Sequence, residues 1–221
     1  MKTATTRTWL FGFAAALLLA MPAWAGPPLL CDPFDTAGAP SLAWGGDRWN
    51  QPLADYDLDR LATRTEALLA ADTPVIARME TLRRAAIYAS RDGRIARQLA
   101  SRLDARIAAA GSGDAKALAL FDSGYFLETL QEVVRLQSYD MPGVGPVDTA
   151  ALRALLAQED GSARIDRALA LRPDDPSMRF AAALVARADQ RAGAGAAHAQ
   201  RARAGAEGDR LLALNIGLIS P

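Results

Sequence analysis

The sequence predicts an all-α protein built from antiparallel helical hairpins, stacked as a short array or gathered into an irregular bundle. Two observations support this fold class. Apolar residues recur every three or four positions through most of the 221-residue chain, whereas none of its segments alternates apolar and polar residues for long enough to indicate a strand. In addition, clusters of Gly, Pro, Asp and Ser separate these periodic segments at short intervals. Such a pattern is typical of helices connected by tight turns.

The N-terminal residues follow the order of a secretory signal peptide. Lys2 and Arg7 precede an apolar run over residues 9–20, and small residues on either side of a tryptophan come directly before Gly26. The run is shorter than the roughly 20 residues that a bilayer-spanning helix needs, and no later segment is apolar for long enough. We therefore expect cleavage between Ala25 and Gly26, a periplasmic or secreted location, and no membrane span in the mature chain.

Charge and cysteine content limit the classes of function. The chain has 25 basic and 25 acidic residues, and loss of Lys2 and Arg7 leaves a small acidic excess. Nucleic acid is not an expected partner, because a phosphate-binding surface requires a sustained positive excess. The single cysteine, Cys31, follows two leucines and lacks the small residue that lipidation requires just before it. It cannot form an internal disulfide either, so stability must come from packing.

Residues 26–54 form an irregular arm ahead of the helical domain. Four prolines and the pair Gly45 and Gly46 exclude a regular helix in its first part. The apolar residues are too many for a pure linker, so we expect the arm to lie along the helical body and cover part of its core. These apolar residues are Leu29, Leu30, Phe34, Leu42, Trp44 and Trp49. The chain therefore divides into a signal peptide (1–25), the arm (26–54) and a helical domain (55–221).

Helices follow one another from residue 55 to about residue 138. The first covers 55–70, and the second begins after Asp72, which we expect to cap it, with Pro74 in its first turn. A turn near residues 90–93 leads into the third helix, which ends at the Gly111–Gly113 turn and closes a helical hairpin over 73–110. Asp114 is the expected cap of the fourth helix.

The second half of the chain predicts shorter helices. A break from Met141 to Pro146 precedes a helix that Asp148 or Thr149 caps, and Asp160 starts the next one. A Pro-Asp-Asp-Pro turn separates that helix from a helix over 177–191. Gly193 and Gly195 then interrupt an Ala- and Arg-rich stretch over 194–206, and a last apolar helix follows Gly208.

The segment from Ala163 to Pro176 joins two of these helices in a way that is typical of repeat proteins. It resembles the boundary between tetratricopeptide repeats, since Ala168, Leu169 and Pro173 have the order of a small residue, a leucine and a proline. Three further sites have the spacing of the large, leucine, glycine and tyrosine positions of that repeat, although they are unevenly spaced along the chain. These three sites are Leu120, Ser123, Gly124 and Leu127; Leu82, Ala85, Ala86 and Ala89; and Arg179, Ala182, Ala183 and Ala186. The alternative to a repeat array is an irregular bundle that obeys the same packing rules.

The resemblance implies a superhelix whose inner face, formed by the first helix of each pair, binds an extended peptide or a partner protein. Candidate partner-binding residues on those helices are Arg83, Arg84, Tyr88, Phe121, Tyr125 and Arg179. The alternative interpretation is that the aromatic residues belong to the core and the arginines to a solvated face.

Catalytic chemistry is present only as fragments. Cys31 needs a base beside it to act as a nucleophile, and the only histidine, His198, lies near the other end of the chain. Glu128 and Glu132 share one helix face, which is not a complete metal or acid–base site. Asp55, Asp57 and Asp59 lie near three aromatic residues in the sequence, namely Trp44, Trp49 and Tyr56. Together they have the combination of acids and aromatic rings that sugar sites use.

No Glu-x-x-His, Cys-x-x-Cys or phosphate-binding glycine loop occurs in the sequence. We therefore expect no metal site, no cofactor and no enzymatic activity. The predicted function is that of an exported, non-catalytic helical scaffold that binds a protein or peptide. The alternatives are a structural helical bundle of the cell envelope without a groove, or a cell-envelope enzyme.

Overall fold

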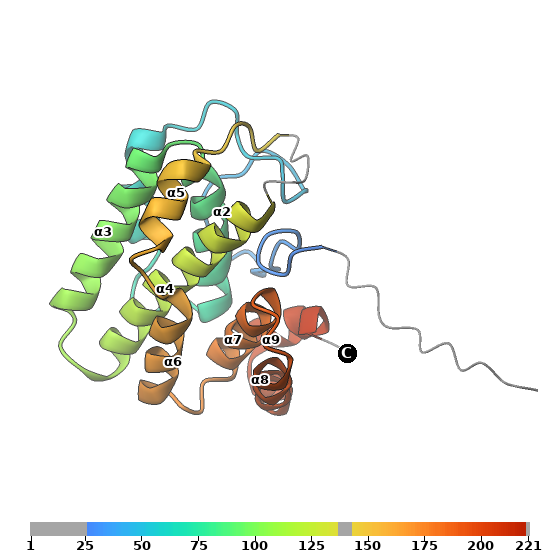
Figure 1. Ribbon diagram of the computed structural model, residues 1–221. Coiled ribbons are helices and arrows are strands. Elements are labelled where there is room, and N and C mark those ends of the chain that lie inside the picture. Colours follow the sequence, from blue (N-terminus) through green and yellow to red (C-terminus); the bar gives the residue numbers. More distant parts are fainter. Residues whose placement is uncertain (1–25, 137–142, 220–221) are drawn as a thin grey trace, which may run out of the picture.

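The computed structural model describes residues 26–136 and 143–219, and within these ranges every regular element is helical, which confirms the all-α fold class (Figure 1). The predicted signal peptide and part of the break between Met141 and Pro146 lie outside the described residues. The elements are η1 (Leu58–Arg60), α1 (Leu61–Ala67), α2 (Val75–Ala89), α3 (Gly93–Ala109), α4 (Gly113–Arg135), α5 (Thr149–Leu156), α6 (Gly161–Leu171), α7 (Pro176–Ala188), α8 (Ala192–Gly205), η3 (Ala206–Gly208), α9 (Arg210–Asn215) and η4 (Ile216–Ile219).

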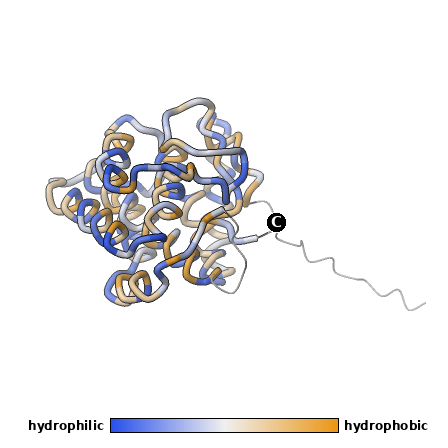
Figure 2. Tube along the Cα trace, turned by 90° about the horizontal axis from the view of Figure 1, so that it is seen from above, coloured by the Kyte–Doolittle hydropathy of each residue, from blue (hydrophilic) through white to orange (hydrophobic). Residues whose placement is uncertain are grey.

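Three helices form the centre of the molecule. Every residue of α2 except Arg84 is buried, and α4 and α7 are buried along most of their length. The helices around them bury one stripe; α3, for example, buries Ile95, Leu99 and Leu103. In Figure 2, short groups of hydrophobic and hydrophilic residues accordingly follow one another along the chain, as expected for helices with one buried side. Since α2 also carries Arg78 and other charged residues, the centre is not purely apolar.

Small residues allow two pairs of helices to approach closely. A Cβ atom at Gly124 of α4 would lie 2.7 Å from the carbonyl oxygen of Gly161 and 2.9 Å from Cγ1 of Ile165, so α6 packs directly on this glycine. In the second pair, a Cβ atom at Gly195 of α8 would lie 3.7 Å from the carbonyl oxygen of Ala183 on α7. The structure thus places α6 directly against Gly124.

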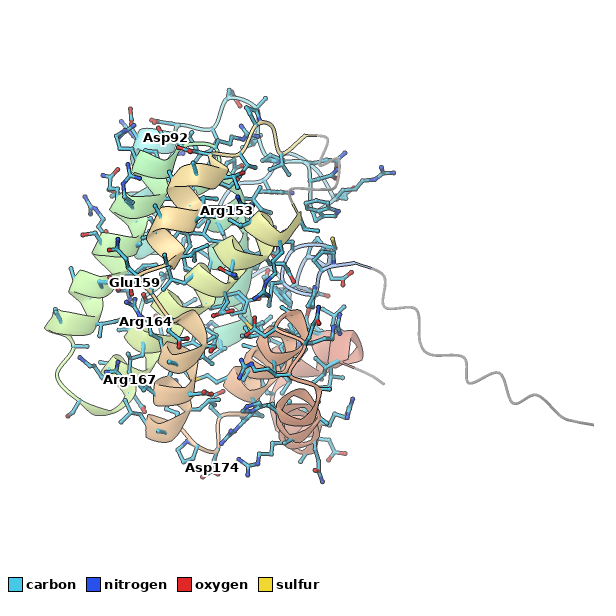
Figure 3. The ribbon with its side chains drawn as sticks, viewed as in Figure 1. Asp92, Arg153, Glu159, Arg164, Arg167 and Asp174 are labelled. Carbon is cyan, nitrogen blue, oxygen red and sulfur yellow. The ribbon has the colours of Figure 1, made fainter. Side chains whose placement is uncertain are left out.

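The seam between α6 and α7 has the predicted form. The first helix ends at Leu171 and the second begins at Pro176, with the side chain of Asp175 accepting a hydrogen bond from the amide of Met178. At the other end of α6, Arg164 forms an ion pair with Glu159, and the two residues lie side by side where α5 gives way to α6 (Figure 3). Arg164 also bonds Asp104 of α3 and Ser123 of α4, so one side chain connects α3, α4 and α6.

Aspartates start most of the helices in the second half of the chain. Asp148 and Asp160 cap α5 and α6 as predicted, each accepting a hydrogen bond from a first-turn amide. Two predicted caps are wrong. Asp114 lies inside the first turn of α4, where its charge faces the positive end of the helix, and Pro74 instead of Asp72 precedes α2. The other aspartate caps are Asp92, Asp175 and Asp209.

Helix boundaries differ from the predictions at further places. The helices predicted over 55–70 and 177–191 end earlier, at Ala67 and Ala188. Residues 55–57 are not helical, and the first helical turn begins only at Leu58. Gly193 and Gly195 do not interrupt α8, which runs continuously through both. A glycine inside a helix costs about 1 kcal/mol relative to alanine. A Cβ atom at Gly195 would make only ordinary van der Waals contact with α7, so packing does not require a glycine there.

The arm lies against the helical body, as the sequence predicted. Leu29 and Leu30 are fully buried, and Phe34 and Leu42 are only 4% and 2% exposed. Figure 1 shows the beginning of the arm, in blue, between the end of α4 and the α7 to α9 region. It forms a turn over Pro27–Cys31 and continues without regular structure, so the molecule holds a non-helical segment against its central helices.

Candidate functional site

The start of the arm is held by side chains that bind its main chain. The carboxylate of Glu132 on α4 accepts a hydrogen bond from the amide of Leu29 at 2.7 Å. Arg83 of α2 donates to the carbonyl oxygen of Leu30 at 3.1 Å. On the same helix, the carboxylate of Glu80 accepts from the amide of Phe34, also at 3.1 Å. Side chains of α2 and α4 therefore bind three main-chain groups of one irregular segment, at Leu29, Leu30 and Phe34.

Asn215 of α9 binds both main-chain groups of one arm residue. Its side-chain oxygen accepts from the amide of Asp35, and its side-chain amide donates to the carbonyl oxygen of Asp35, both at 2.9 Å. This is the pairing that a neighbouring β-strand would make, and it does not depend on which side chain the bound residue carries. Beside it, the ring of Phe34 meets Phe180 of α7 edge-on, with 6.0 Å between ring centroids.

The middle of the arm is held around Tyr88 of α2. Its hydroxyl donates to the carbonyl oxygen of Ala43 at 2.8 Å and accepts from the amide of Leu53 at 3.0 Å. The ring of Tyr56 stacks on Tyr88 with a centroid distance of 4.0 Å, and Trp44 packs on its edge. This aromatic cluster attaches the second part of the arm through rings and hydrogen bonds together.

We name this surface the arm-binding face. It is made of the side chains that contact the arm from four helices, and two of its guanidinium groups also lie over the ring of Trp44, at 5.4 and 5.7 Å. Its members are Glu80, Arg83, Arg84, Tyr88, Glu132, Phe180 and Asn215.

The two carboxylates of the arm-binding face have opposite electrostatic environments. Burial would raise the pKa of Glu80, but the hydrogen bonds and charge of Arg83 and the charge of Arg84 lower the pKa of that carboxyl below its ordinary value. Burial raises the pKa of Glu132 to about 8, and the amide of Leu29 opposes this shift only in part. Glu80 is therefore ionised at neutral pH, whereas Glu132 is largely protonated.

The structure brings three of the six predicted partner-binding residues together. Arg83, Arg84 and Tyr88 all lie under the arm, and the structure places the protein's own chain where the sequence predicted a partner. The alternative interpretation of the arginines as a solvated face does not describe Arg83, whose side chain is fully buried, nor Arg84, whose side chain is 20% exposed.

The other three candidates lie elsewhere. Phe121 and Tyr125 are fully buried and stack on one another, with ring centroids 5.7 Å apart, which matches their interpretation as core residues. Burial raises the pKa of Tyr125 well above its ordinary value. Arg179 lies near the surface, where it donates to the carbonyl oxygen of Pro173 and contacts Nδ1 of His198 at 3.3 Å.

Sequence reasoning missed Glu80, Phe180 and Asn215, and it considered Glu132 only as part of a carboxylate pair. No local signal marks these residues, because a polar or aromatic residue inside a helix faces the arm only through tertiary packing. Glu128 and Glu132 are separated by their contacts, since Glu132 binds the arm while Glu128 lies against Gly161 of α6. Burial raises the pKa of Glu128 to about 7.

The fragments of catalytic chemistry are used in other ways. Burial, followed by the charge of Glu132, raises the pKa of Cys31 to about 11, so its thiol is protonated at neutral pH. His198 contacts Arg179, and burial lowers the pKa of its imidazole. Within the described ranges, no group of three or more His, Cys, Asp or Glu side chains could hold a metal ion.

The residues with a sugar-site composition are likewise divided between other contacts. Trp44 and Tyr56 pack on Tyr88, as described above. On the surface, Asp57 pairs with Arg60 at 3.4 Å, and Asp59 pairs with Arg94 at 3.2 Å. These contacts support the attachment of the arm and the start of the first helix.

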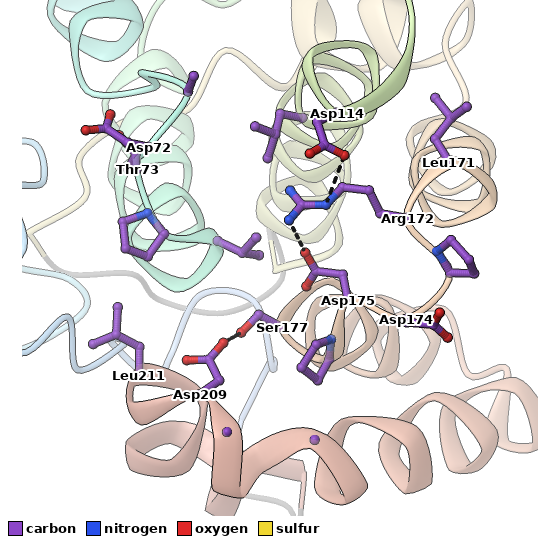
Figure 4. A pocket seen from close by; sticks show the side chains of 18 of the residues that line it. Asp72, Thr73, Asp114, Leu171, Arg172, Asp174, Asp175, Ser177, Asp209 and Leu211 are labelled. Carbon is purple, nitrogen blue, oxygen red and sulfur yellow. Dashed lines mark hydrogen bonds and ion pairs between the residues drawn. The ribbon is translucent and has the colours of Figure 1, made fainter.

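A cleft of about 940 Å³ opens at the N-terminal ends of α2, α4, α7 and α9 (Figure 4). Inside it, Arg172 pairs with Asp175 at 3.0 Å and lies 3.9 Å from Asp114. The hydroxyl of Ser177 donates to Asp209 at 2.6 Å, so these polar groups satisfy one another. The arm-binding face therefore remains the candidate functional site.

Comparison with protein-family models, with curated proteins and with solved structures finds no match for this chain. None of the helices in the described ranges combines the length and the apolar character that crossing a bilayer requires.

Proposed function

We propose that this protein is an exported, non-catalytic helical scaffold whose arm-binding face holds a protein or peptide segment. The observation that carries the proposal is that the arm-binding face holds the arm through hydrogen bonds to its main chain. Glu80, Arg83, Glu132 and Asn215 all bind main-chain amides or carbonyls of an irregular segment, and they come from α2, α4 and α9. A surface that binds main-chain groups accepts segments of different sequence.

The polarity of the face supports this proposal over a purely structural role. Removing charged groups from water costs several kcal/mol per ion, which an apolar contact between arm and helices would avoid. Here Glu80 forms buried ion pairs with Arg83 and Arg84, and each of these three side chains also binds the arm. Charged groups arranged around a bound main chain are typical of a binding surface.

The order of the helices supports a short hairpin array. α4 packs closely on α6, α7 packs closely on α8, and α4 also contacts α2 and α7. A tetratricopeptide-like stack has such pairs, and its inner face would carry α2, α4 and α7, three of the four helices that bear the arm-binding face. The pair of α2 and α3 departs from this order, because each of them packs more extensively on α4 than on the other. The insertion of α5 between α4 and α6 departs from a regular repeat.

Selection from a library of random displayed peptides tests the proposed function. The target is the protein carrying Phe34→Ala, in which one apolar contact of the resident arm with Phe180 is removed. Selected peptides are then measured by fluorescence polarisation against the same protein with Asn215→Ala added. We expect this change to weaken binding about tenfold, because two hydrogen bonds to the bound main chain are lost.

Ser101→Ala on the exposed side of α3 is the matched control and should leave peptide affinity unchanged. The structural-bundle alternative predicts that no peptide is selected. It would also be favoured if selected peptides bound equally well to the Asn215→Ala and Ser101→Ala proteins, since they would then bind away from the arm-binding face.

A further inference from the structure

Resting on the proposed function, we propose that residues 26–35 are an exchangeable resident ligand of the arm-binding face, and that the partner is a segment with the same anchor pattern. This pattern consists of two adjacent leucines in a proline-led turn, followed by an aromatic residue in chain without regular structure. The pattern is read from Pro28, Leu29, Leu30 and Phe34 of the arm.

A self-contained turn connects residues 26–35 to the rest of the arm. The hydroxyl of Thr36 donates to the carbonyl oxygen of Ala39, and the carboxylate of Asp35 accepts from the amide of Ala37. These hydrogen bonds stay within the turn and do not involve the helices. The first segment can therefore leave the face without breaking the contacts of the second.

The second part of the arm remains attached when the first part leaves. Tyr88 bonds Ala43 and Leu53, and the rings of Trp44 and Tyr56 pack on it. Departure of residues 26–35 therefore uncovers the part of the face made by Glu80, Arg83, Glu132, Phe180 and Asn215, and the aromatic cluster stays covered.

The groups of the uncovered part of the face determine which segment can bind there next. Glu132 would lose the amide of Leu29, and Asn215 would lose both main-chain groups of Asp35, so an incoming main chain must supply the same groups. The positions of Leu29, Leu30 and Phe34 would be open to apolar side chains. Pro33 and Asp35 are exposed, so the partner can vary at those positions.

A labelled peptide tests this inference directly. The probe is a fluorescein-labelled peptide with the sequence of residues 26–35, carrying Cys31→Ser to prevent oxidation. We expect weak binding to the wild-type protein and binding that is at least about tenfold tighter to the Phe34→Ala protein. The reason is that the apparent affinity of the probe is proportional to the fraction of protein molecules whose face is not occupied by residues 26–35. Asp47→Ala, an exposed change in the second part of the arm, should behave like wild type.

A peptide in which the phenylalanine is also replaced by alanine should bind the Phe34→Ala protein about tenfold more weakly than the first probe. The inference is overturned if the Phe34→Ala protein keeps its helical circular dichroism yet binds the first probe no better than wild type. If library-selected peptides still bind the Asn215-dependent face while this probe does not, the proposed function stands and only the anchor pattern fails.

Hydrogen exchange of the wild-type protein tests exchangeability without any substitution. The amides of Leu29 and Phe34 should exchange through a local opening, faster than the buried amide of Tyr125 in α4 and faster than the amide of Leu53. Equal protection of all four amides would show that residues 26–35 leave only when the whole protein unfolds, and would overturn the proposal.

Discussion

Glu80 and Glu132 accept hydrogen bonds from the same arm, yet their pKa values move in opposite directions. Glu80 has two arginines beside it, which lower its pKa, while burial outweighs the amide of Leu29 and the charges of Arg135 and Arg187 and raises the pKa of Glu132 to about 8. A carboxyl whose pKa is raised on folding binds its proton more tightly in the folded state, so its contribution to stability is lost as the pH rises. Glu128 and Asp122, with pKa values of about 7 and about 6, have the same sign.

Glu132→Gln should therefore flatten the dependence of stability on pH. The ordinary pKa of 4.5 and the folded value of about 8 define the window in which the wild type loses this contribution. Above pH 8 the variant should be more stable than wild type by on the order of 1–3 kcal/mol, and near pH 4 the advantage should vanish. Urea unfolding at several pH values measures this difference.

Glu207→Gln is the control for this prediction. Because Glu207 is exposed, the difference in free energy of unfolding between this variant and the wild type should not follow the pH dependence expected for Glu132→Gln. A constant difference between Glu132→Gln and wild type from pH 4 to pH 9 would contradict the assignment of a raised pKa to Glu132.

At the scale of the element, a few small residues determine how closely the helices pack. The clearest comparison is between two helical glycines. A Cβ atom at Gly124 would meet the main chain of Gly161 and the side chains of Arg164 and Ile165, while a Cβ atom at Gly193 of α8 would meet nothing within 4 Å. The first glycine is required by packing, and the second is not.

Gly124→Ala should destabilise the protein by about 1–3 kcal/mol, because the main chain of α6 cannot move aside as a flexible side chain could. Gly193→Ala should instead stabilise it by about 0.5 kcal/mol through the lower backbone entropy of the unfolded chain. Thermal or urea unfolding of the two variants checks the opposite signs. Equal effects would show that α6 does not depend on the small surface at Gly124.

At the scale of the whole molecule, the arm is part of the fold and also the occupant of its candidate site. Removal of residues 26–41 should leave the helical circular dichroism nearly unchanged, because these residues contribute no helix. It should increase the fluorescence of a hydrophobic dye, because Phe180 and its neighbours lose the cover of Leu29, Leu30 and Phe34.

The Asp47→Ala protein, with its arm intact, provides the reference for dye binding. Loss of helical signal in the shortened protein would show that the arm is required for folding and would favour the structural-bundle alternative. Unchanged dye fluorescence would show that the helices close over the face once the arm is gone.

The sequence by itself determined the helices and most of their ends, because these depend on local features. The period of apolar residues, the caps at Asp148 and Asp160 and the seam from Ala163 to Pro176 all act within a few residues. The prediction was wrong at Gly193 and Gly195, where the helix α8 as a whole continues although each glycine is a weak helix former.

Only the tertiary structure decided what the central helices hold. Glu132 and Leu29 are 103 residues apart in the chain, and Asn215 and Asp35 are 180 residues apart. Arg83, Arg84 and Tyr88 were identified from their helix, but a charged residue in a helix has the same local pattern whether it faces water or a buried main chain. Their convergence on the arm depends on long-range packing, which no local period encodes.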